Sequence, residues 1–184
     1  MDTKELAEAL RKLNAEQEAR LADSFNRSLP FQDGFFDRWE RAERLGFGEK
    51  ASIYNSTLVF GDVSVGEGTW VGPFVVLDGS AGLTIGKFCS ISSGVQIYTH
   101  DTVAWALSGG KAPPKRAPVA IADCCYIGSQ SIVAAGVTIG TQAVVAANSF
   151  VNRDVPPRTI VGGSPARPLG RVEIDGDDIQ LRYD

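Results

Sequence analysis

The chain has 184 residues, the length of one domain with a single continuous core. Its composition is 43% hydrophobic and 22% charged with a formal net charge of -4, which excludes global disorder and argues against a nucleic-acid partner. No apolar run approaches the roughly 18 residues of a membrane span, and the charged N-terminus is unlike a signal peptide, so we expect a cytoplasmic protein without a membrane span.

The N-terminal segment, residues 1–50, is dense in charged residues and predicts helices. Asp2 can cap a first helix, which should stop before Pro30. A second short helix is expected from about Asp33 to Gly46, since a glycine is typical of the position after a helix. The apolar positions of both helices are interpreted as packing positions, although an exposed apolar stripe could also contact another subunit.

From Ile53 the sequence repeats with a period of six. Fourteen blocks begin with Ile, Leu or Val, and the fifth position is Thr, Val, Ala, Cys or Ser in all but one block, where it is Asp101. The block 77–84 is two residues too long. Residues 103–120 interrupt the repeat and contain Gly-Gly and Pro-Pro pairs, which predicts an extruded loop of the kind that often carries function.

A period of six is typical of hexapeptide β-helices, in which three blocks would form one triangular coil. The first-position side chains of successive coils then stack in the interior, with strands about 4.8 Å apart. Fourteen blocks predict between four and five coils. The expected fold is mainly β: a parallel β-helix over residues 51–171, preceded by the helical segment and followed by a C-terminal tail, 172–184. The helices and the residues after Val155 should cover its ends.

Cysteine usage points to reduced thiols. Cys89, Cys124 and Cys125 are an odd number without the spacing of a metal site. Cys89 and Cys125 fill fifth positions and are interpreted as buried structural thiols, while Cys124 is expected to be exposed. The acidic residues 175–178 lack the spacing of a calcium loop and are interpreted as a solvated turn. No metal site is predicted.

The C-terminal repeats are similar to those of a known family. The run IGSQSIVAAGVTIGTQAVVAANSFVNRDVPPRTIVGGSPARPLG resembles the hexapeptide acyltransferases, especially the galactoside, maltose and xenobiotic acetyltransferases and the O-antigen sugar acetyltransferases. The resemblance covers about residues 53–171. It implies left-handed coils, a homotrimer with active sites between neighbouring subunits, and acetyl transfer from acetyl-CoA to a sugar or sugar nucleotide, as in lipopolysaccharide O-antigen biosynthesis.

His100 is the only histidine and lies where the first run of repeats ends, in IYTHDT. Acetyl transfer to a hydroxyl or amine needs a base, and an imidazole with an ordinary pKa near 6.5 suits that task. The family's catalytic histidine lies at the same place, so the resemblance implies that His100 is the general base. A histidine that only satisfies loop backbone groups is the alternative. Asp101 follows directly, but neighbouring side chains on extended backbone diverge, so we do not expect it to orient the imidazole.

Several residues are candidates for acceptor binding. Trp105, in the loop, could stack on a sugar ring or simply anchor the loop. Lys111, Lys115 and Arg116 form a small basic cluster, interpreted as a solvated loop surface rather than a phosphate site. The resemblance implies an acceptor-binding carboxylate near Asp78, in the over-long block.

Coenzyme A is long and anionic, so its site should combine a narrow groove with a few cations at the phosphate end. Small side chains of the C-terminal coils are expected to form that groove along one coil edge: Ala134, Ala135, Ala146 and Ala147. The resemblance implies phosphate contacts from Arg153 and Arg167. A further basic position of the family falls on Gly170, one step from Arg171.

The resemblance also places Ser129 near the thioester, where an oxyanion would develop, and Tyr126 where many relatives have a tryptophan beside the coenzyme. Each of these residues has a structural alternative. The alanines can simply relieve crowding, the arginines can be solvated, and Ser129 can serve the turn.

Two functions remain open from the sequence. The favoured interpretation is a coenzyme-A-dependent acetyltransferase, with O- and N-acetylation not separated because one base serves either acceptor. A non-catalytic β-helix that acts as a scaffold or binding protein is the alternative. A γ-type carbonic anhydrase is excluded, since its zinc site needs several histidines.

Overall fold

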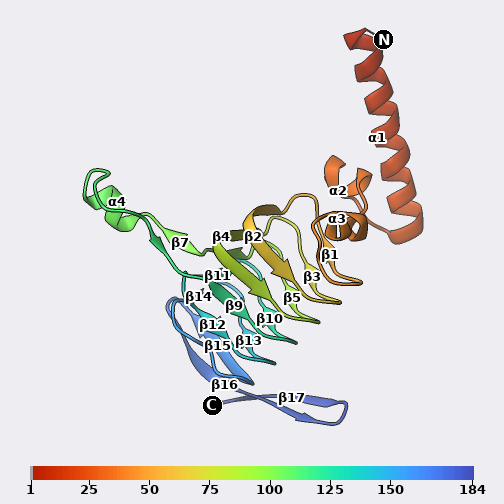
Figure 1. The fold of residues 1–184 in the computed structure, drawn as a ribbon. Coiled ribbons are helices and arrows are strands. Elements are labelled where there is room, and N and C mark those ends of the chain that lie inside the picture. Colours follow the sequence, from red (N-terminus) through yellow and green to blue (C-terminus); the bar gives the residue numbers. More distant parts are fainter. Residues whose placement is uncertain (1) are drawn as a thin grey trace.

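A computed structural model describes residues 2–184. Three helices form the N-terminal part: α1 (Thr3–Phe25), α2 (Phe31–Phe35) and α3 (Arg38–Arg44). Asp2 caps α1 as predicted, because its carboxylate accepts from the backbone N–H of Glu5 while the Glu5 side chain accepts from the N–H of Asp2. The helix projects away from the strands (Figure 1).

The second helix expected between residues 33 and 46 is instead two helices. The chain is extended at Phe36 and Asp37, and the Asp37 carboxylate accepts from the N–H groups of Trp39 and Glu40. An N-cap of this kind starts a new helix, which is why α2 cannot run on into α3. No helix within residues 2–184 is long and apolar enough to span a membrane.

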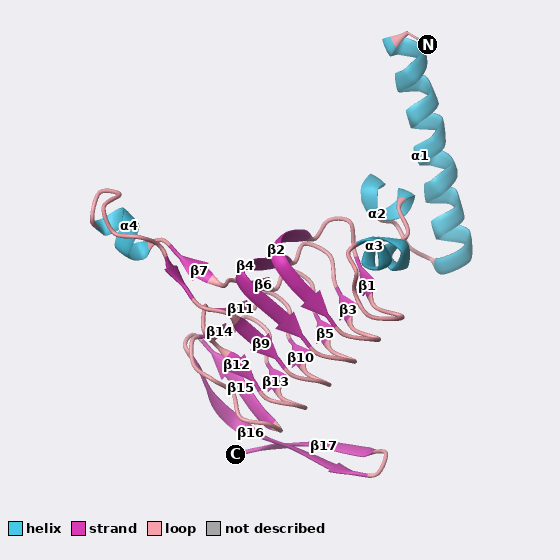
Figure 2. Cartoon of the chain, in the orientation of Figure 1, coloured by secondary structure: helices cyan, strands magenta, loops and turns pink. Residues whose placement is uncertain are grey.

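Short parallel strands stack into a three-sided solenoid (Figure 2). The first face holds β1 (Ser52–Ile53), β3 (Trp70–Val71), β5 (Ser90–Ile91), β10 (Tyr126–Ile127), β13 (Val144–Val145) and β15 (Thr159–Gly163). The second face holds the first halves of β2 (Leu58–Val65) and β4 (Val76–Ile85), then β6 (Gln96–Ile97), β11 (Ile132–Val133) and β14 (Phe150–Val151). The third face holds the second halves of β2 and β4, then β9 (Val119–Ile121) and β12 (Thr138–Ile139).

These sheets are those expected of a left-handed parallel β-helix of hexapeptide repeats, so the predicted fold class is confirmed. The predicted number of coils is too low. Six strands stack on the first face because β15 adds a strand after the last six-residue block.

The six-residue period builds the core. The first-position side chains of the fourteen blocks are all buried except Val59, which is half-buried because β2 pairs with β4 alone and forms the edge of its sheet. Each fully buried Ile, Leu or Val contributes roughly 1.5–3 kcal/mol. The stack of these side chains is therefore the main stabilising feature of the solenoid.

Fifth-position side chains link one coil to the next at the corners. Thr57 and Thr69 donate their hydroxyls to the carbonyls of Gly72 and Gly86, each at 2.7 Å. Cys89 and Cys125 are buried as predicted, and Cys124 is exposed. Small polar groups at this position thus satisfy backbone carbonyls inside tight corners.

Both ends of the solenoid are covered. Ala42 of α3 and the following Phe47 join the core cluster above β1. At the other end β15 pairs antiparallel with β16 (Ala166–Asp175), and β16 pairs with β17 (Asp178–Tyr183). β16 runs through residue 171, where we expected the repeat domain to end and the tail to begin. The residues between Asp175 and Asp178 form the predicted turn.

The extruded loop is an arm with structure of its own, and we call residues 102–118 the arm. It leaves after β7 (His100–Asp101), contains α4 (Val103–Leu107), and returns through β8 (Lys115–Arg116), which pairs antiparallel with β7. Figure 1 shows it projecting from the solenoid. The expected loop end at residue 120 is corrected, because Val119 and Ala120 already belong to β9.

Candidate active site

Two corners of the solenoid carry the residues singled out in the sequence. We call the turns that follow the first-face strands the first corner, and those that follow the second-face strands the second corner. Asp78 and His100 both lie at the second corner, on neighbouring coils, because Leu77 of β4 is in register with Ile97 of β6. The arm leaves from this corner directly after His100.

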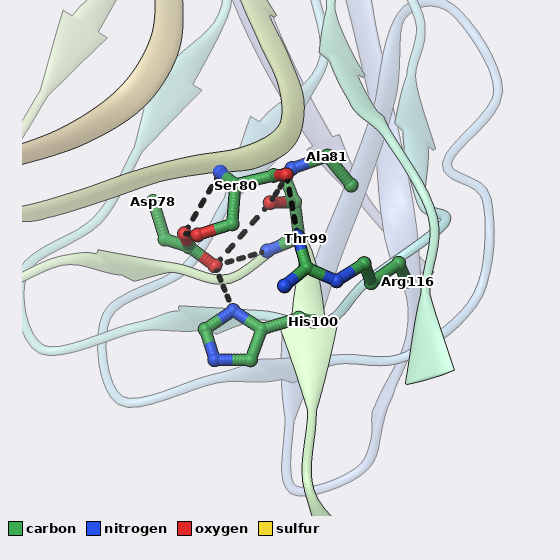
Figure 3. Close-up of polar contacts among 6 residues, drawn as sticks. All are labelled: Asp78, Ser80, Ala81, Thr99, His100 and Arg116. Carbon is green, nitrogen blue, oxygen red and sulfur yellow. Dashed lines mark hydrogen bonds and ion pairs between the residues drawn. The ribbon is translucent and has the colours of Figure 1, made fainter. Parts of the chain in front are cut away.

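His100 and Asp78 form a hydrogen-bonded pair. The Nδ1 atom of His100 lies 2.6 Å from Oδ2 of Asp78, with the His100 side chain 36% exposed and the Asp78 side chain 3% exposed. The carboxylate also accepts from the N–H of Thr99 at 2.9 Å and from the N–H and hydroxyl of Ser80 (Figure 3). The imidazole is therefore partly exposed and has a buried carboxylate against its Nδ1 atom.

The ionisation of Asp78 follows from these contacts. Burial raises the pKa of the Asp78 carboxyl, but hydrogen bonds from Ser80, Thr99 and His100 outweigh that effect and hold its pKa well below the usual range. The carboxylate is therefore charged, which requires the proton of a neutral imidazole to sit on Nδ1 and leaves Nε2 as a free acceptor.

The burial of Asp78 favours a role other than the one expected from the sequence. We expected a carboxylate that binds the acceptor; in the structure this carboxylate is buried and hydrogen-bonded to Ser80, Thr99 and the imidazole. The pairing was missed because Asp78 lies 22 positions before His100. The only signal was the over-long block, whose extra residues let β4 continue across the corner. Asp101, as expected, does not contact the imidazole; its carboxylate accepts from the N–H of Val103.

Some of the predicted coenzyme residues share the second corner with His100. The N–H of Tyr98 donates to Val133, and that of Ala134 donates to Val151, so successive coils stack at this corner. Ala134 and Ala135 lie one coil beyond His100, and Arg153 lies exposed one coil further.

The other predicted coenzyme residues lie at the first corner. The N–H of Asn148 donates to the carbonyl of Ser129 at 2.9 Å, which stacks Ser129 and the neighbouring Ala147 on adjacent coils. Arg167 pairs with Gly162 in the β15–β16 ladder at the end of the same corner. Tyr126 lies in the first-face strand just before the turn that holds Ser129, and it is 45% exposed.

The four alanines therefore do not line one coil edge as expected. Ala134 and Ala135 follow a second-face strand, whereas Ala146 and Ala147 follow a first-face strand. The first corner needs small residues for its own packing: a Cβ at Gly128 would lie 2.5 Å from the backbone nitrogen of Ala147, and one at Gly162 would lie 3.0 Å from the Cβ of Ala146. Within one chain, the residues of the two corners do not converge.

The remaining candidates are on the arm. Trp105 is 49% exposed, and a Cβ at Gly110 would lie 3.7 Å from its indole, so the ring packs on the turn of the arm. Stacking of Trp105 on a sugar stays a prediction. Lys115 pairs with Asp101 in the β7–β8 ladder and Arg116 pairs with His100, which brings one cation of the basic cluster to the base.

A hollow at the N-terminal end of the solenoid lies apart from this site. It lies beside α3 and is lined in part by Trp39, Glu40, Glu43 and Glu49. Its carboxylates would repel the phosphates of coenzyme A. Among the residues described, no three His, Cys, Asp or Glu side chains gather as a metal site.

Comparison with known proteins decides the family. A hexapeptide-repeat containing acetyltransferase from Vibrio cholerae O1 biovar eltor, VCA0836, solved with acetyl coenzyme A, is 33% identical, with 91% of this chain and 89% of that chain aligned and a TM-score of 0.62. The chain belongs to the hexapeptide-repeat acetyltransferases. No model of a protein family matches it.

Two further proteins extend the comparison of this hexapeptide-repeat acetyltransferase. The Bacillus cereus N-acyltransferase AntD, solved with dTDP-4-amino-4,6-dideoxyglucose and coenzyme A, shares the fold at 23% identity over 72% of this chain and 88% of that chain, with a TM-score of 0.60. A chloramphenicol acetyltransferase of Morganella morganii is 34% identical over 120 residues, which are 54% of this chain and 55% of that protein. The chain matches only 27% to 58% of the length of such curated relatives.

Proposed function

We propose that this protein moves an acetyl group from acetyl-CoA to a hydroxyl or amine of a sugar or sugar nucleotide, with His100 as general base. The observation that carries the proposal is the His100–Asp78 pair at the foot of the arm. A buried, charged carboxylate on Nδ1 orients the ring and stabilises the imidazolium that forms when Nε2 takes a proton. The exposed Nε2 edge is the side open to an acceptor.

The chemistry assigned to His100 has two proton transfers. Nε2 removes the proton from the acceptor hydroxyl or amine while the acceptor atom bonds to the thioester carbon. The carbon–sulfur bond then breaks, and the imidazolium returns the proton to the departing thiolate. Asp78 remains ionised throughout and compensates the transient positive charge of the ring. No covalent link between the enzyme and the acetyl group is needed.

The residues of the first corner fit a coenzyme. Tyr126, Ser129 and Arg167 follow one another along that corner, and the Arg167 guanidinium is exposed, with a hydrogen bond to the Ala166 carbonyl. We assign Arg167 to coenzyme phosphates, Ser129 to the thioester oxyanion and Ala147 to the groove. Acetyl-CoA in the VCA0836 complex supports this donor. Arg153, at the second corner, is the other candidate phosphate contact.

The separation of the two corners supports a shared site. We propose a homotrimer in which the second corner of one subunit, with His100, faces the first corner of its neighbour. This assembly would bring together the base and the coenzyme residues that a single chain holds apart. A sugar-nucleotide acceptor is supported by the dTDP-sugar bound to AntD. We place the reaction in the cytoplasm, where acetyl-CoA is available, and in sugar assembly of the O-antigen type.

The proposal is tested by thiol release. Wild-type protein, His100→Ala and the neighbouring carboxylate control Asp101→Asn are incubated with acetyl-CoA and a panel of sugars, amino sugars and sugar nucleotides. We expect turnover by wild type and Asp101→Asn and a loss of about 100-fold or more in His100→Ala. Calorimetry measures coenzyme A binding in parallel. If wild type neither releases thiol nor binds coenzyme A, the protein is a scaffold instead.

A further inference from the structure

Arg116 is the one cation of the arm that the fold brings to the base. In the β7–β8 ladder its residue partner is His100, so the returning strand of the arm carries it to the second corner. In Figure 3 its guanidinium lies between the Ser80 backbone and the His100 side chain. The mechanism described above does not use this side chain.

One edge of the guanidinium is already held in place. Nη1 of Arg116 donates to the carbonyl of Ser80 at 3.0 Å. Ser80 also donates to Asp78, whose other oxygen contacts His100. The cation and the base are therefore fixed on the same short segment. Arginine loses rotamer entropy when it binds a ligand, and this anchor reduces that loss.

The rest of the guanidinium has no anion from the protein. Among the ion pairs of residues 2–184, none includes Arg116. The nearest buried carboxylate, Asp78, is occupied by Ser80, Thr99 and His100, and Asp101 accepts from the backbone of Val103. An exposed guanidinium has five N–H donors in a planar fork that matches a carboxylate or phosphate.

We propose that Arg116 is an anion-binding residue of the acceptor site, so that the acceptor carries a phosphate or carboxylate close to the group that is acetylated. That the bound anion belongs to an acceptor rests on the proposed function, whereas the anion site itself rests only on the geometry. It names a substrate class: phosphorylated sugars, sugar nucleotides or sugar acids, and not neutral sugars. Lys115, on the same strand, faces Asp101 and lacks this position.

The single histidine makes a test possible that does not depend on turnover. Protein labelled at histidine gives one imidazole signal, from His100, in an NMR spectrum. Inorganic phosphate and acetate are titrated separately into wild type, Arg116→Gln, Arg116→Lys and the control Lys115→Gln, with sodium chloride at equal ionic strength as the blank. Gln at position 116 keeps a polar side chain but carries no charge.

In wild type and Lys115→Gln we expect a saturable shift of the His100 signal with at least one of the two anions, and the two titrations tell phosphate from carboxylate. Arg116→Gln should raise the apparent Kd about tenfold or more, and Arg116→Lys, which keeps the charge without the fork, should lie between. The proposal is overturned if wild type shows no saturable shift or if Arg116→Gln retains the wild-type shift. It is also overturned if Lys115→Gln loses anion affinity as much as Arg116→Gln does. If thiol release fails while the anion response is present, the proposed function is at fault and the anion site stands.

Discussion

At the scale of single residues, the site depends on a buried charge. Asp78 holds its charge because five hydrogen-bond donors surround it, and that charge sets which nitrogen of His100 carries the proton. The proposed role of His100 as base and the proposed role of Asp78 as its orienting partner are therefore coupled. Two experiments on Asp78→Asn separate this arrangement from a merely structural one.

Asp78→Asn should lower kcat by about 100-fold or more while leaving the KM for acetyl-CoA nearly unchanged. The amide keeps the shape of the carboxylate but cannot stabilise an imidazolium. Steady-state thiol release measures both constants, with Asp101→Asn as the matched control on the adjacent carboxylate. A kcat within about twofold of wild type would show that the base works without this partner.

Asp78 should also make the stability of the fold depend on pH. Its pKa is lowered in the folded protein, so its charge stabilises the native state above the unfolded pKa of about 3.9, and this contribution is lost as pH falls through the lower folded value. Urea unfolding at several pH values should show a gap between wild type and Asp78→Asn that is constant near neutrality and closes below about pH 4.

The exposed Asp177→Asn serves as the control for that experiment, since this residue lies in the solvated turn before β17. The free energy of unfolding of Asp177→Asn should equal that of wild type at each pH. A gap between wild type and Asp78→Asn that widens as the solution becomes more acidic would contradict the sign derived for Asp78.

The sequence singled out His100 as the candidate base, but it did not predict that Asp78 lies against the imidazole. The histidine could be found because it ends a regular repeat, whereas the contact with Asp78 depends on how one coil sits on the next. Six-residue periodicity shows which residues point inward, and it carries no information on contacts between corner side chains of neighbouring coils. Arg116 is exposed, as the solvated-surface interpretation expected, but its place beside His100 could not be predicted for the same reason, since it follows from the pairing of β7 with β8.

At the scale of elements, most strands follow from the period of six, and the exceptions have local causes. The break between α2 and α3 comes from the cap at Asp37. The helix α4 is a single short turn inside the arm, and the β16–β17 hairpin is antiparallel, so neither carries the repeat. The coils, in contrast, could be predicted because every one buries the same kind of side chain at the same step.

Replacing a buried isoleucine by alanine should destabilise the fold far more than the same replacement of an exposed isoleucine. Ile127, on the first face, is fully buried, and Ile127→Ala should reduce the free energy of unfolding by about 3 kcal/mol through lost burial and a cavity. Ile179 in β17 is 65% exposed, and Ile179→Ala should cost about 0.5 kcal/mol or less. Urea titration of both variants compares them, and equal losses would contradict the interior stack.

At the scale of the whole molecule, the site depends on how the two corners meet. From the sequence we expected the four alanines along one coil edge, but with three blocks to a coil the turns after neighbouring blocks fall on different corners. In the structure, His100 and Arg153 share one corner, while Ser129, Ala147 and Arg167 share another. A threefold assembly offers a heterologous interface in which these two corners can face each other.

Subunit mixing tests that arrangement directly. His100→Ala and Arg167→Ala should each be weak at low acetyl-CoA concentration, the first through loss of the base and the second through a higher KM for the coenzyme. If equal amounts are unfolded and refolded together, about a quarter of the interfaces should combine two intact corners and recover about that share of wild-type activity. Activity no higher than that of the separately refolded variants would place the whole site in one chain.

The arm has a consequence for how such enzymes can diversify. Leu83, Thr84 and Ile85 pair with Val119, Ala120 and Ile121 in unbroken register, so the ladder closes as though residues 102–118 were absent. The arm is therefore an insertion that can be lengthened, shortened or exchanged with little loss of stability in the solenoid. Under the proposed function, we expect a different arm on the same coils to change which acceptor is bound and to leave coenzyme A binding unchanged.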